Sequence, residues 1–477
     1  MNPDPSMTIK VRFAPSPTGP FSIGNARTAL FNWLVAKKHN GKFYLRIEDT
    51  DEERSKIEFE QQIINSLQWL GLNWDDQIIR QSERKEIYKN YLQKLLDEGK
   101  AYYCFCSLQE LEAERQAQLS QGLIPKYSGR CRNIDYNTAK ERAKKEKYVI
   151  RFKMPETQIT FTDKIHGRVS FDTSLFGDII IAKSLTQPIW HFAVVIDDYE
   201  MGITDVIRGE DHLTNTPKQI MIQKALNFPQ PRYAHLPLIL GSDRKKLSKR
   251  YLDYSLLDYK RDGYLPQALV NFIVLLGWHP QKNKEVLSVD EIIQEFSLER
   301  VQKSGAIYNP EKLNWLNSYY IKKMTDNELL NYIIDILPPD WNDKEKILKI
   351  IHIEKERIIK LTDLFNIGQF FFKLPDYEPK LLIWKFSEPI KVLNNLQKIL
   401  QIAQNIDNEQ KFIDQIQQLA ETTNRGEVLW PLRVALSGQE ASPGPFDIIN
   451  VLGLKESLAR IQIAVDKFKN FLYGNNK

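Results

Sequence analysis

The sequence predicts an α/β protein with a doubly wound parallel sheet, an antiparallel insertion and a helical carboxyl-terminal region. Strands and helices alternate over residues 1–100, short strands dominate 101–190, and helical periodicity with long polar faces runs from Met324 to the end. Parallel strands need crossover helices between them, whereas antiparallel strands follow one another through short turns. The change of pattern therefore marks where one architecture interrupts the other.

Length, charge and cysteine content limit the class of protein. The chain has 477 residues, too many for a single core, so we expect roughly two to four domains. Its net charge of +5 is compatible with a polyanionic partner and does not demand one. The amino terminus lacks the apolar core of a signal peptide, and no stretch reaches the roughly 20 apolar residues of a membrane span. Three cysteines, an odd number, cannot form a disulfide framework, and they fit a reducing compartment. We therefore expect a cytoplasmic protein with no membrane partner.

The amino-terminal segment predicts a strand, a Gly/Pro loop and a helix. Residues Ile9–Phe13 form the strand, and apolar residues recur on one helical face from Ala26 onward. In an open parallel sheet, such a loop and the helix N-terminus point backbone amides at a bound phosphate. Gly24 lets the backbone approach the ligand, and Ser22 and Asn25 add small polar groups. The same arrangement also occurs as a plain structural connection.

A second strand, Lys42–Ile47, ends in a run of acidic residues that begins with Glu48. One interpretation is a solvated turn with a helix N-cap at Thr50 or Asp51. The other is that Glu48, at the carboxyl end of its strand, faces the crevice and binds an ammonium group. The next helices are predicted at Ile57–Leu70 and Arg84–Glu98.

The insertion contains a candidate metal site. Cys104 and Cys106 are one residue apart and Cys131 follows on a later loop, which supplies three of the four ligands of a structural zinc. Tyr127, Asn133 or a water molecule completes the set. Alternatively, the cysteines are small buried apolar residues on a hairpin.

Beyond the cysteines, a charged helix precedes several short strands, after which parallel alternation resumes. The helix is expected at Thr138–Lys147, and the strands at Tyr148–Met154, Ile159–Lys164, Val169–Asp172 and Ile179–Lys183, with a hairpin turn at His166-Gly167. An apolar run, Trp190–Ile196, then leads to strands at Asp205–Arg208 and His235–Leu240, with a helix beginning at Thr216-Pro217.

The loop Gly241–Arg250 crowds five basic residues among Gly, Ser and Asp. Without anions to neutralise them, such closely spaced cations repel one another. The loop leaves the carboxyl end of a predicted strand, as the amino-terminal loop does, so we expect both loops to meet at one polyphosphate. A solvated loop or a weak nucleic-acid patch remains as the alternative.

Several blocks in a fixed order make the chain resemble the bacterial glutamyl-tRNA synthetases, which are class I aminoacyl-tRNA synthetases, over essentially its whole length. The blocks are Arg12–Gly19, Ser22–Asn25 (at the HIGH-type signature), Arg27–Asn32, Arg46–Asp51, Arg80–Arg84, Val206–His212 and Lys246–Arg250 (at the KMSKS-type loop).

The resemblance implies a domain organisation built around a Rossmann-type parallel sheet. The catalytic domain occupies 1–100 and 191–254, an α+β acceptor-stem-binding insertion 101–190, a helical stem-contact domain 255–323, and an all-α anticodon-binding domain 324–477. The helical carboxyl-terminal region contrasts with the β-barrels of glutaminyl-tRNA synthetases.

The resemblance also implies an activity: ligation of L-glutamate to tRNA(Glu) through glutamyl-adenylate, with ATP and Mg²⁺ and with release of AMP and pyrophosphate. The implied catalytic residues are Lys246, Lys249, Ser22 and Asn25. The implied ATP-binding residues are Ser16, Gly24, Asp211, Leu247, Ser248 and Lys249. The implied glutamate-binding residues are Arg12, Ala14, Ser16, Glu48, Trp190, Val194 and Arg208. Within that set, Arg12 and Arg208 grip the side-chain carboxylate and Glu48 the α-ammonium.

Arg357 and Arg433 are candidate tRNA contacts, the former being equally consistent with a surface arginine, and a monomer is the family expectation. Two positions depart from the family pattern: Ser22 replaces a histidine, and Trp190 replaces a tyrosine. We expect activity to survive, because both lysines, both arginines and Glu48 are present. The competing hypotheses are a slow or non-catalytic tRNA-binding paralogue, a ligase for a different amino acid, and a non-discriminating enzyme that also charges tRNA(Gln).

Overall fold

The computed structural model describes residues 8–245, 254–404, 406 and 408–474. The chain divides into two compact units. The first comprises Met1–Arg261 and Pro266–Leu313, and the second comprises Asp262–Leu265 and Asn314–Lys477. Each unit has its own apolar core, as a chain of this length requires.

The first unit is built on the predicted parallel strands. Strand β1 (Lys10–Phe13) pairs in parallel with β2 (Lys42–Ile47), which pairs with β3 (Ile79–Arg80). Strand β10 (Asp205–Gly209) pairs in parallel with β11 (Arg232–Leu236). The backbone N–H of Thr204 donates to the carbonyl of Lys10 at 2.9 Å, so β1 and β10 lie side by side. The order of the strands therefore reverses between β1 and β10, which is where open α/β sheets bind ligands.

Helix α1 (Ile23–Lys38) follows β1 and is buried on most of its circumference. Ala26 and Leu34 have no exposed surface, and Asn32 donates its amide N–H to the carbonyl of Ile207 on β10 at 3.0 Å. Helices α10 (Pro266–Val274) and α11 (Val289–Glu295) also contact α1. A helix covered on both sides needs no polar face, and this explains the long apolar run in its sequence.

The segment after β2 corrects one prediction. Helix α2 (Ile57–Trp69) begins with Lys56 as its N-cap, so neither Thr50 nor Asp51 caps it. The Asp51 carboxylate instead accepts from Arg54 at 2.7 Å within a turn. The remaining helices of this half are α3 (Lys85–Asp97), α6 (Trp190–Glu200) and α7 (Thr216–Leu226), of which α6 contains the apolar run.

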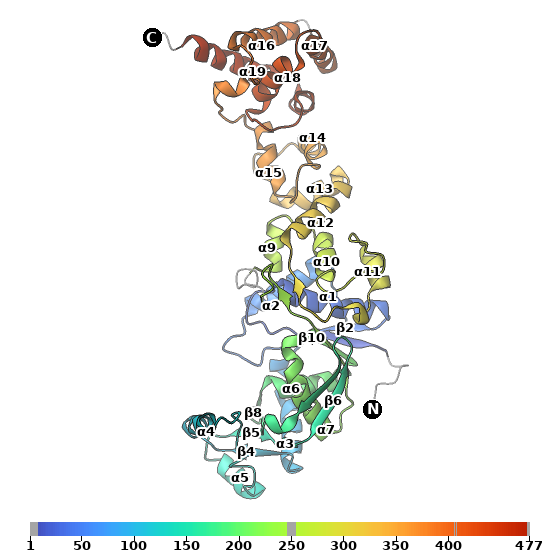
Figure 1. The fold of residues 1–477 in the computed structure, drawn as a ribbon, viewed down its shortest axis with the longest axis vertical. Helices are drawn as coiled ribbons and strands as arrows, with labels where there is room; N and C mark the ends of the chain where they lie inside the picture. The colour runs from blue at the N-terminus through green and yellow to red at the C-terminus, as the bar shows by residue number, and fades with distance from the viewer. Residues whose placement is uncertain (1–7, 246–253, 405, 407, 475–477) are drawn as a thin grey trace. The chain divides into compact units, whose positions relative to one another are not determined.

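The predicted insertion divides between two sheets. Strands β4 (Ala101–Cys104), β5 (Val149–Phe152), β8 (Ile180–Ser184) and β9 (Gln187–Pro188) form an antiparallel sheet with helices α4 (Leu108–Ser120) and α5 (Tyr136–Ala143) beside it in sequence. The hairpin β6 (Gln158–Asp163) and β7 (Gly167–Asp172) instead extends the β10–β11 sheet, because Asp163 pairs with Tyr233 of β11. Figure 1 labels β6 of this hairpin in the green part of the chain.

The strand predicted at His235–Leu240 is split in two after Leu236. Its second part, β12 (Ile239–Leu240), pairs in parallel with β13 (Ala306–Ile307). The other helices of this part of the chain are α9 (Leu256–Arg261) and α12 (Pro310–Lys323).

The described residues after α12 form helices and no strand, as predicted. These helices are α13 (Asp326–Ile333), α14 (Lys344–Glu354), α15 (Asp363–Gly368), α16 (Pro389–Ala403), α17 (Glu409–Thr422), α18 (Arg425–Ser437) and α19 (Pro445–Tyr473). Helices α16 to α19 pack together around Leu396, Ile416, Leu432 and Ile461 (Figure 1). Within the described ranges, no helix is long and apolar enough to cross a membrane.

Candidate active site

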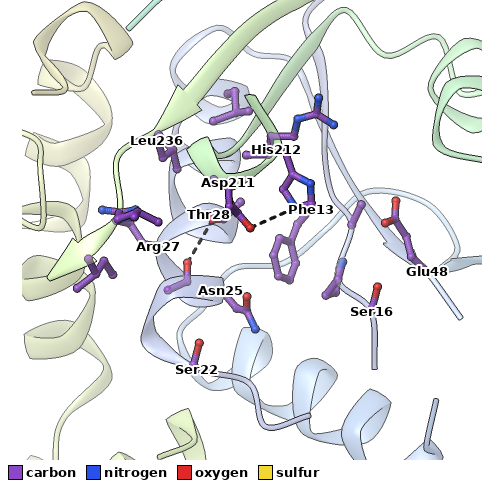
Figure 2. Close-up of a pocket in the computed structure, with 18 of the residues that line it drawn as sticks. Phe13, Ser16, Ser22, Asn25, Arg27, Thr28, Glu48, Asp211, His212 and Leu236 are labelled. Atoms are coloured by element: carbon purple, nitrogen blue, oxygen red, sulfur yellow. Dashed lines mark hydrogen bonds and ion pairs between the residues drawn. The ribbon is translucent and has the colours of Figure 1, made fainter. Parts of the chain in front are cut away.

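A cavity of about 350 Å³ opens at the carboxyl ends of β1 and β10. Figure 2 shows Ser16 and Glu48 on one side of it, Arg27 and Leu236 on the other, and Asn25 on the first turn of α1. Loops from the two halves of the sheet meet here, as expected at the point where strand order reverses.

Most of the residues expected at the site line this cavity. They are Arg12, Ala14, Ser16, Ser22, Gly24, Asn25, Glu48, Trp190, Arg208 and Asp211. Val194 is 2% exposed on α6, one turn beyond Trp190, and is not among the lining residues. Lys246, Leu247, Ser248 and Lys249 lie outside the described residues.

Arg12 and Arg46 share a buried carboxylate that the sequence analysis did not single out. Asp198 of α6 accepts from Arg12 Nε at 2.9 Å and from Arg46 Nη1 at 2.7 Å. The two guanidinium groups lower the pKa of Asp198, against the opposing effect of burial. The signal in the sequence was an Asp197-Asp198 pair directly after an apolar run, but its partners are more than a hundred residues away.

Glu48 is held by two donors, one on each oxygen. Arg46 Nη2 donates to Oε1 at 2.9 Å, and the indole N–H of Trp190 donates to Oε2 at 2.5 Å. Burial raises the pKa of Glu48 above its ordinary value, while Arg46 and Trp190 act in the opposite direction. The carboxylate is 5% exposed and lines the cavity, which suits recognition of a cation that enters from solvent.

Arg208 has only neutral partners among the described side chains. Its Nε donates to His235 Nε2 at 3.3 Å, and its Nη2 donates to Thr216 Oγ1 at 2.7 Å and to Gln219 Oε1 at 2.8 Å. Its Nη1 is buried without a hydrogen-bond partner. Burial, with Arg12 nearby, lowers the pKa of Arg208 to about 10. A buried guanidinium with a spare donor and an uncancelled charge is suited to binding a carboxylate.

Two histidines flank Trp190 and were not predicted as site residues. His212 lines the cavity with its ring centroid 4.8 Å from that of Trp190, and His191 lies next to Trp190 on α6. Burial and neighbouring cations lower the pKa of each to about 4. Both are therefore neutral at physiological pH and add no charge to the site. Asp211, 3.6 Å from His212 Nε2, has a side chain that is 63% exposed.

The first turn of α1 forms the floor of the site. Ser22 occupies the N-cap position, but its side chain makes no capping hydrogen bond. The first backbone N–H groups of a helix have no intrahelical acceptor, so this turn offers donors to an anion. Arg27 also lines the cavity, and it ties α1 to its neighbours by donating to the carbonyls of Pro237 and Leu276.

The three cysteines of the insertion converge. The sulfur atoms of Cys104, Cys106 and Cys131 all lie within 4.8 Å of one another. The phenol oxygen of Tyr127 is 3.4 Å from Cys104 Sγ and 3.5 Å from Cys106 Sγ, and it also accepts the backbone N–H of Cys131 at 3.0 Å. Three sulfurs at this spacing supply three of the four ligands of a structural zinc site, and the Tyr127 oxygen lies beside them.

Both candidate tRNA-contacting arginines lie in the second unit, and each has protein partners. Arg357 Nη1 donates to the buried carboxylate of Glu354 at 2.8 Å, while 39% of the Arg357 side chain stays exposed. Arg433 donates to the carbonyl of Glu440 at 2.7 Å, and its guanidinium lies 4.5 Å from the ring centroid of Trp430. Burial and the charge of Arg357 lower the pKa of Arg433, so the two cations are electrostatically coupled.

Comparison with known proteins identifies the family to which the chain belongs. Residues 8–315 match the family model of the catalytic domain of class I tRNA synthetases (E and Q), and residues 325–465 match an anticodon binding domain. Glutamate-tRNA ligase 2 of Thermoanaerobacter pseudethanolicus is 43% identical over 470 residues, covering 96% of this chain and 98% of that protein. The chain belongs to the glutamate-tRNA ligase family.

Other members of the glutamate-tRNA ligase family agree. The ligase of Aquifex aeolicus is 42% identical over 470 residues, covering 96% of this chain and 99% of that protein. A crystal structure of the ligase from Elizabethkingia meningosepticum in complex with its amino acid has a TM-score of 0.88 at 35% identity, covering 97% of this chain and all of that one. The expected class I fold, with its parallel sheet and helical carboxyl-terminal domain, is confirmed.

Proposed function

We propose that this protein ligates L-glutamate to tRNA(Glu) in two steps, first forming glutamyl-adenylate from ATP. The observation that carries the proposal is Arg208, a residue of the cavity wall whose buried guanidinium has neutral partners and a spare donor. The charge of Arg12 is already met by Asp198, so Arg208 supplies the uncancelled positive charge that selects an acidic side chain. Glutamate, with two carboxylates and one ammonium, provides the matching net charge.

The proposed chemistry depends on positioning and charge rather than on a general base. The α-carboxylate of glutamate is already a nucleophile, and it attacks the α-phosphorus of ATP as pyrophosphate leaves. The first turn of α1, with Ser22, Gly24 and Asn25, binds the phosphates from one side. Lys246 and Lys249 are assigned to the other side, and Mg²⁺ supplies further neutralisation of the polyphosphate when bound.

The adenylate then passes glutamate to the tRNA. A ribose hydroxyl of the terminal adenosine attacks the activated carbonyl, and AMP leaves. Glu48 holds the α-ammonium, with Ala14, Ser16 and Trp190 beside it on the cavity wall. Asp211, exposed at the mouth, is assigned to the ATP side.

The test is tRNA-dependent ATP/pyrophosphate exchange with glutamate. The expected result is exchange that is lost in Lys249→Ala, and whose KM for glutamate rises at least about tenfold in Arg208→Gln, because a charged hydrogen bond is removed. Wild-type exchange no greater than that of Lys249→Ala would leave a tRNA-binding paralogue. Preference for another amino acid in the same assay would contradict the role of Arg208. Charging of tRNA(Glu) and tRNA(Gln) transcripts side by side measures discrimination.

We also propose a structural zinc ion held by Cys104, Cys106, Cys131 and Tyr127. The converging sulfurs support this assignment, and so does the chemistry of the set, since thiolates are preferred zinc ligands. The metal would stabilise the loop that carries Cys131 against β4, and it takes no part in the reaction.

For the second unit, we propose that Arg357 contacts the tRNA anticodon loop. Its support is the match of residues 325–465 to an anticodon binding domain and the exposed part of its guanidinium. Arg433 is assigned a weaker contact, because backbone carbonyls already occupy two of its donors. Arg357→Ala should raise the KM for tRNA and leave the KM for glutamate unchanged.

We further propose that the protein acts as a cytoplasmic monomer. Sedimentation equilibrium at micromolar concentration tests the oligomeric state.

A further inference from the structure

We propose that His235, oriented by Asp163, is a positioning residue that aims Arg208 at the substrate carboxylate. The inference rests on the proposed assignment of Arg208. Neither His235 nor Asp163 lines the cavity, so both act through Arg208 and not on the ligand.

The pair is buried and geometrically fixed. His235 Nδ1 lies 2.7 Å from Asp163 Oδ2, and neither side chain has exposed surface. The same Oδ2 accepts the backbone N–H of His235 at 3.0 Å. Oδ1 accepts the backbone N–H groups of Ile165 and His166, each at 2.9 Å. Every described contact of this carboxylate is a donor, so Asp163 is an acceptor that fixes the ring.

This arrangement selects one tautomer of His235. Because Nδ1 donates to Asp163, Nε2 is the acceptor, and Arg208 Nε, which can only donate, lies 3.3 Å from it. The hydroxyl of Thr216, which can donate or accept, lies 2.9 Å from the same nitrogen. A guanidinium N–H can only donate, so a proton on His235 Nε2 would leave the Nε–H of Arg208 without an acceptor. Burial and the charge of Arg208 lower the pKa of His235, which agrees with a neutral ring.

The consequence for Arg208 is both directional and electrostatic. His235, Thr216 and Gln219 occupy Nε and Nη2, which leaves Nη1 as the guanidinium nitrogen without a described partner. A carboxylate in place of the imidazole would hold the guanidinium equally well, but it would cancel the charge that attracts the substrate. A neutral imidazole kept in the accepting tautomer orients the cation and leaves its charge available.

The pair also joins two parts of the sheet, since Asp163 ends β6 and His235 lies on β11. A role confined to this connection would make both residues important for stability alone. The two roles differ in what they predict for the KM of glutamate.

Two substitutions of His235 separate the roles. In His235→Asn, the side-chain amide reproduces the Nδ1 donor to Asp163 but cannot reach Arg208. In His235→Gln, the longer side chain places an acceptor near the former Nε2 and gives up the link to Asp163. KM values for glutamate and for ATP are measured by tRNA-dependent exchange, together with the unfolding temperature of each variant.

We expect His235→Asn to raise the KM for glutamate about tenfold or more, because a hydrogen bond to a charged group is lost. His235→Gln should stay within about threefold of wild type, and the KM for ATP should be unchanged in both. Equal KM values for glutamate in the two variants would overturn the inference and leave a structural role. Arg208→Gln is the reference: if it does not raise this KM, the assignment of Arg208 and the inference fail together.

A measurement on the wild-type protein covers the case in which neither variant folds. Long-range ¹H–¹⁵N spectra of the ¹⁵N-histidine-labelled full chain report which ring nitrogen carries the proton. The expected result is a protonated Nδ1 and an unprotonated Nε2 whose shift changes when glutamate is added. A proton on Nε2, or an Nε2 shift indifferent to saturating glutamate, would overturn the inference.

Discussion

Trp190 donates its indole N–H to the buried carboxylate of Glu48, with 2.5 Å between Nε1 and Oε2. The other carboxylate oxygen of Glu48 accepts from Arg46. The contact shows that Trp190 supplies a donor to Glu48. Glu48 is therefore held in one orientation at the cavity from both sides.

Replacing Trp190 by phenylalanine removes this donor while an aromatic ring remains. We expect the KM for glutamate to rise about tenfold, because a hydrogen bond to a charged group contributes about 1.5–3 kcal/mol. Trp190→Tyr, which restores a polar aromatic side chain, is the matched control and should lie closer to wild type. Steady-state exchange kinetics measure both, and an unchanged KM in Trp190→Phe would show that Arg46 alone holds Glu48.

The raised pKa of Glu48 predicts pH-dependent substrate binding. As pH falls through that raised value, Glu48 takes up a proton and loses its attraction for the α-ammonium, so the KM for glutamate should increase toward acidic pH. In Glu48→Gln, the KM should be high and should depend less on pH. Exchange assays at pH values from about 5.5 to about 8 test this pH dependence of the KM. Parallel pH profiles for the two proteins would assign the titration to another group.

Ser22 occupies the N-cap of α1, and its hydroxyl can donate a hydrogen bond but cannot become a cation. We expect Ser22→Ala to lower the rate of glutamate activation by about three- to tenfold, the effect of one neutral hydrogen bond. Ser120→Ala, at the exposed end of α4, is the control. An unaltered rate in Ser22→Ala would mean that the backbone amides of α1 act without the side chain.

Metal content tests the cysteine cluster. The purified protein should contain about one zinc ion per chain, the number that one four-ligand site holds, and Cys106→Ser should lose most of it. Tyr127→Phe should weaken zinc binding in competition with a chelator. Tyr136→Phe, which removes a phenol bonded to Asp97 at 2.7 Å, is the control. If Tyr127→Phe binds zinc as wild type does, water or another group is the fourth ligand.

Glu354 predicts a pH-dependent stability of the second unit. Burial raises its pKa from 4.5 to about 7, against the opposing effect of Arg357. The folded state therefore binds the proton more tightly than the unfolded state, and stability should decrease as pH rises from 4.5 to about 7. Calorimetry of Glu354→Gln should show a smaller difference in stability between about pH 5 and about pH 8 than the wild type shows. Glu356→Gln, whose carboxylate is 65% exposed, is the control and should behave as wild type.

Local patterns in the sequence predicted most of the elements around the site. The run before Pro15, the change of period after it and the acidic end of β2 each reflect interactions within a few residues. The same locality explains the error at Thr50 and Asp51, since polar residues after a strand suit a helix N-cap and a tight turn equally well. Only the starting point of α2, six residues further along, distinguishes the two.

By itself, the sequence predicted the class I fold, the strand–loop–helix at the cavity, and the cavity residues Arg12, Glu48 and Arg208. The tertiary structure decided how their charges are distributed. Asp198 cancels the charge of Arg12 across 186 positions, whereas Arg208 keeps its charge because His235, held by Asp163, is neutral. Coulombic and hydrogen-bonding partners are chosen by distance in space, and sequence spacing carries no information about such distances.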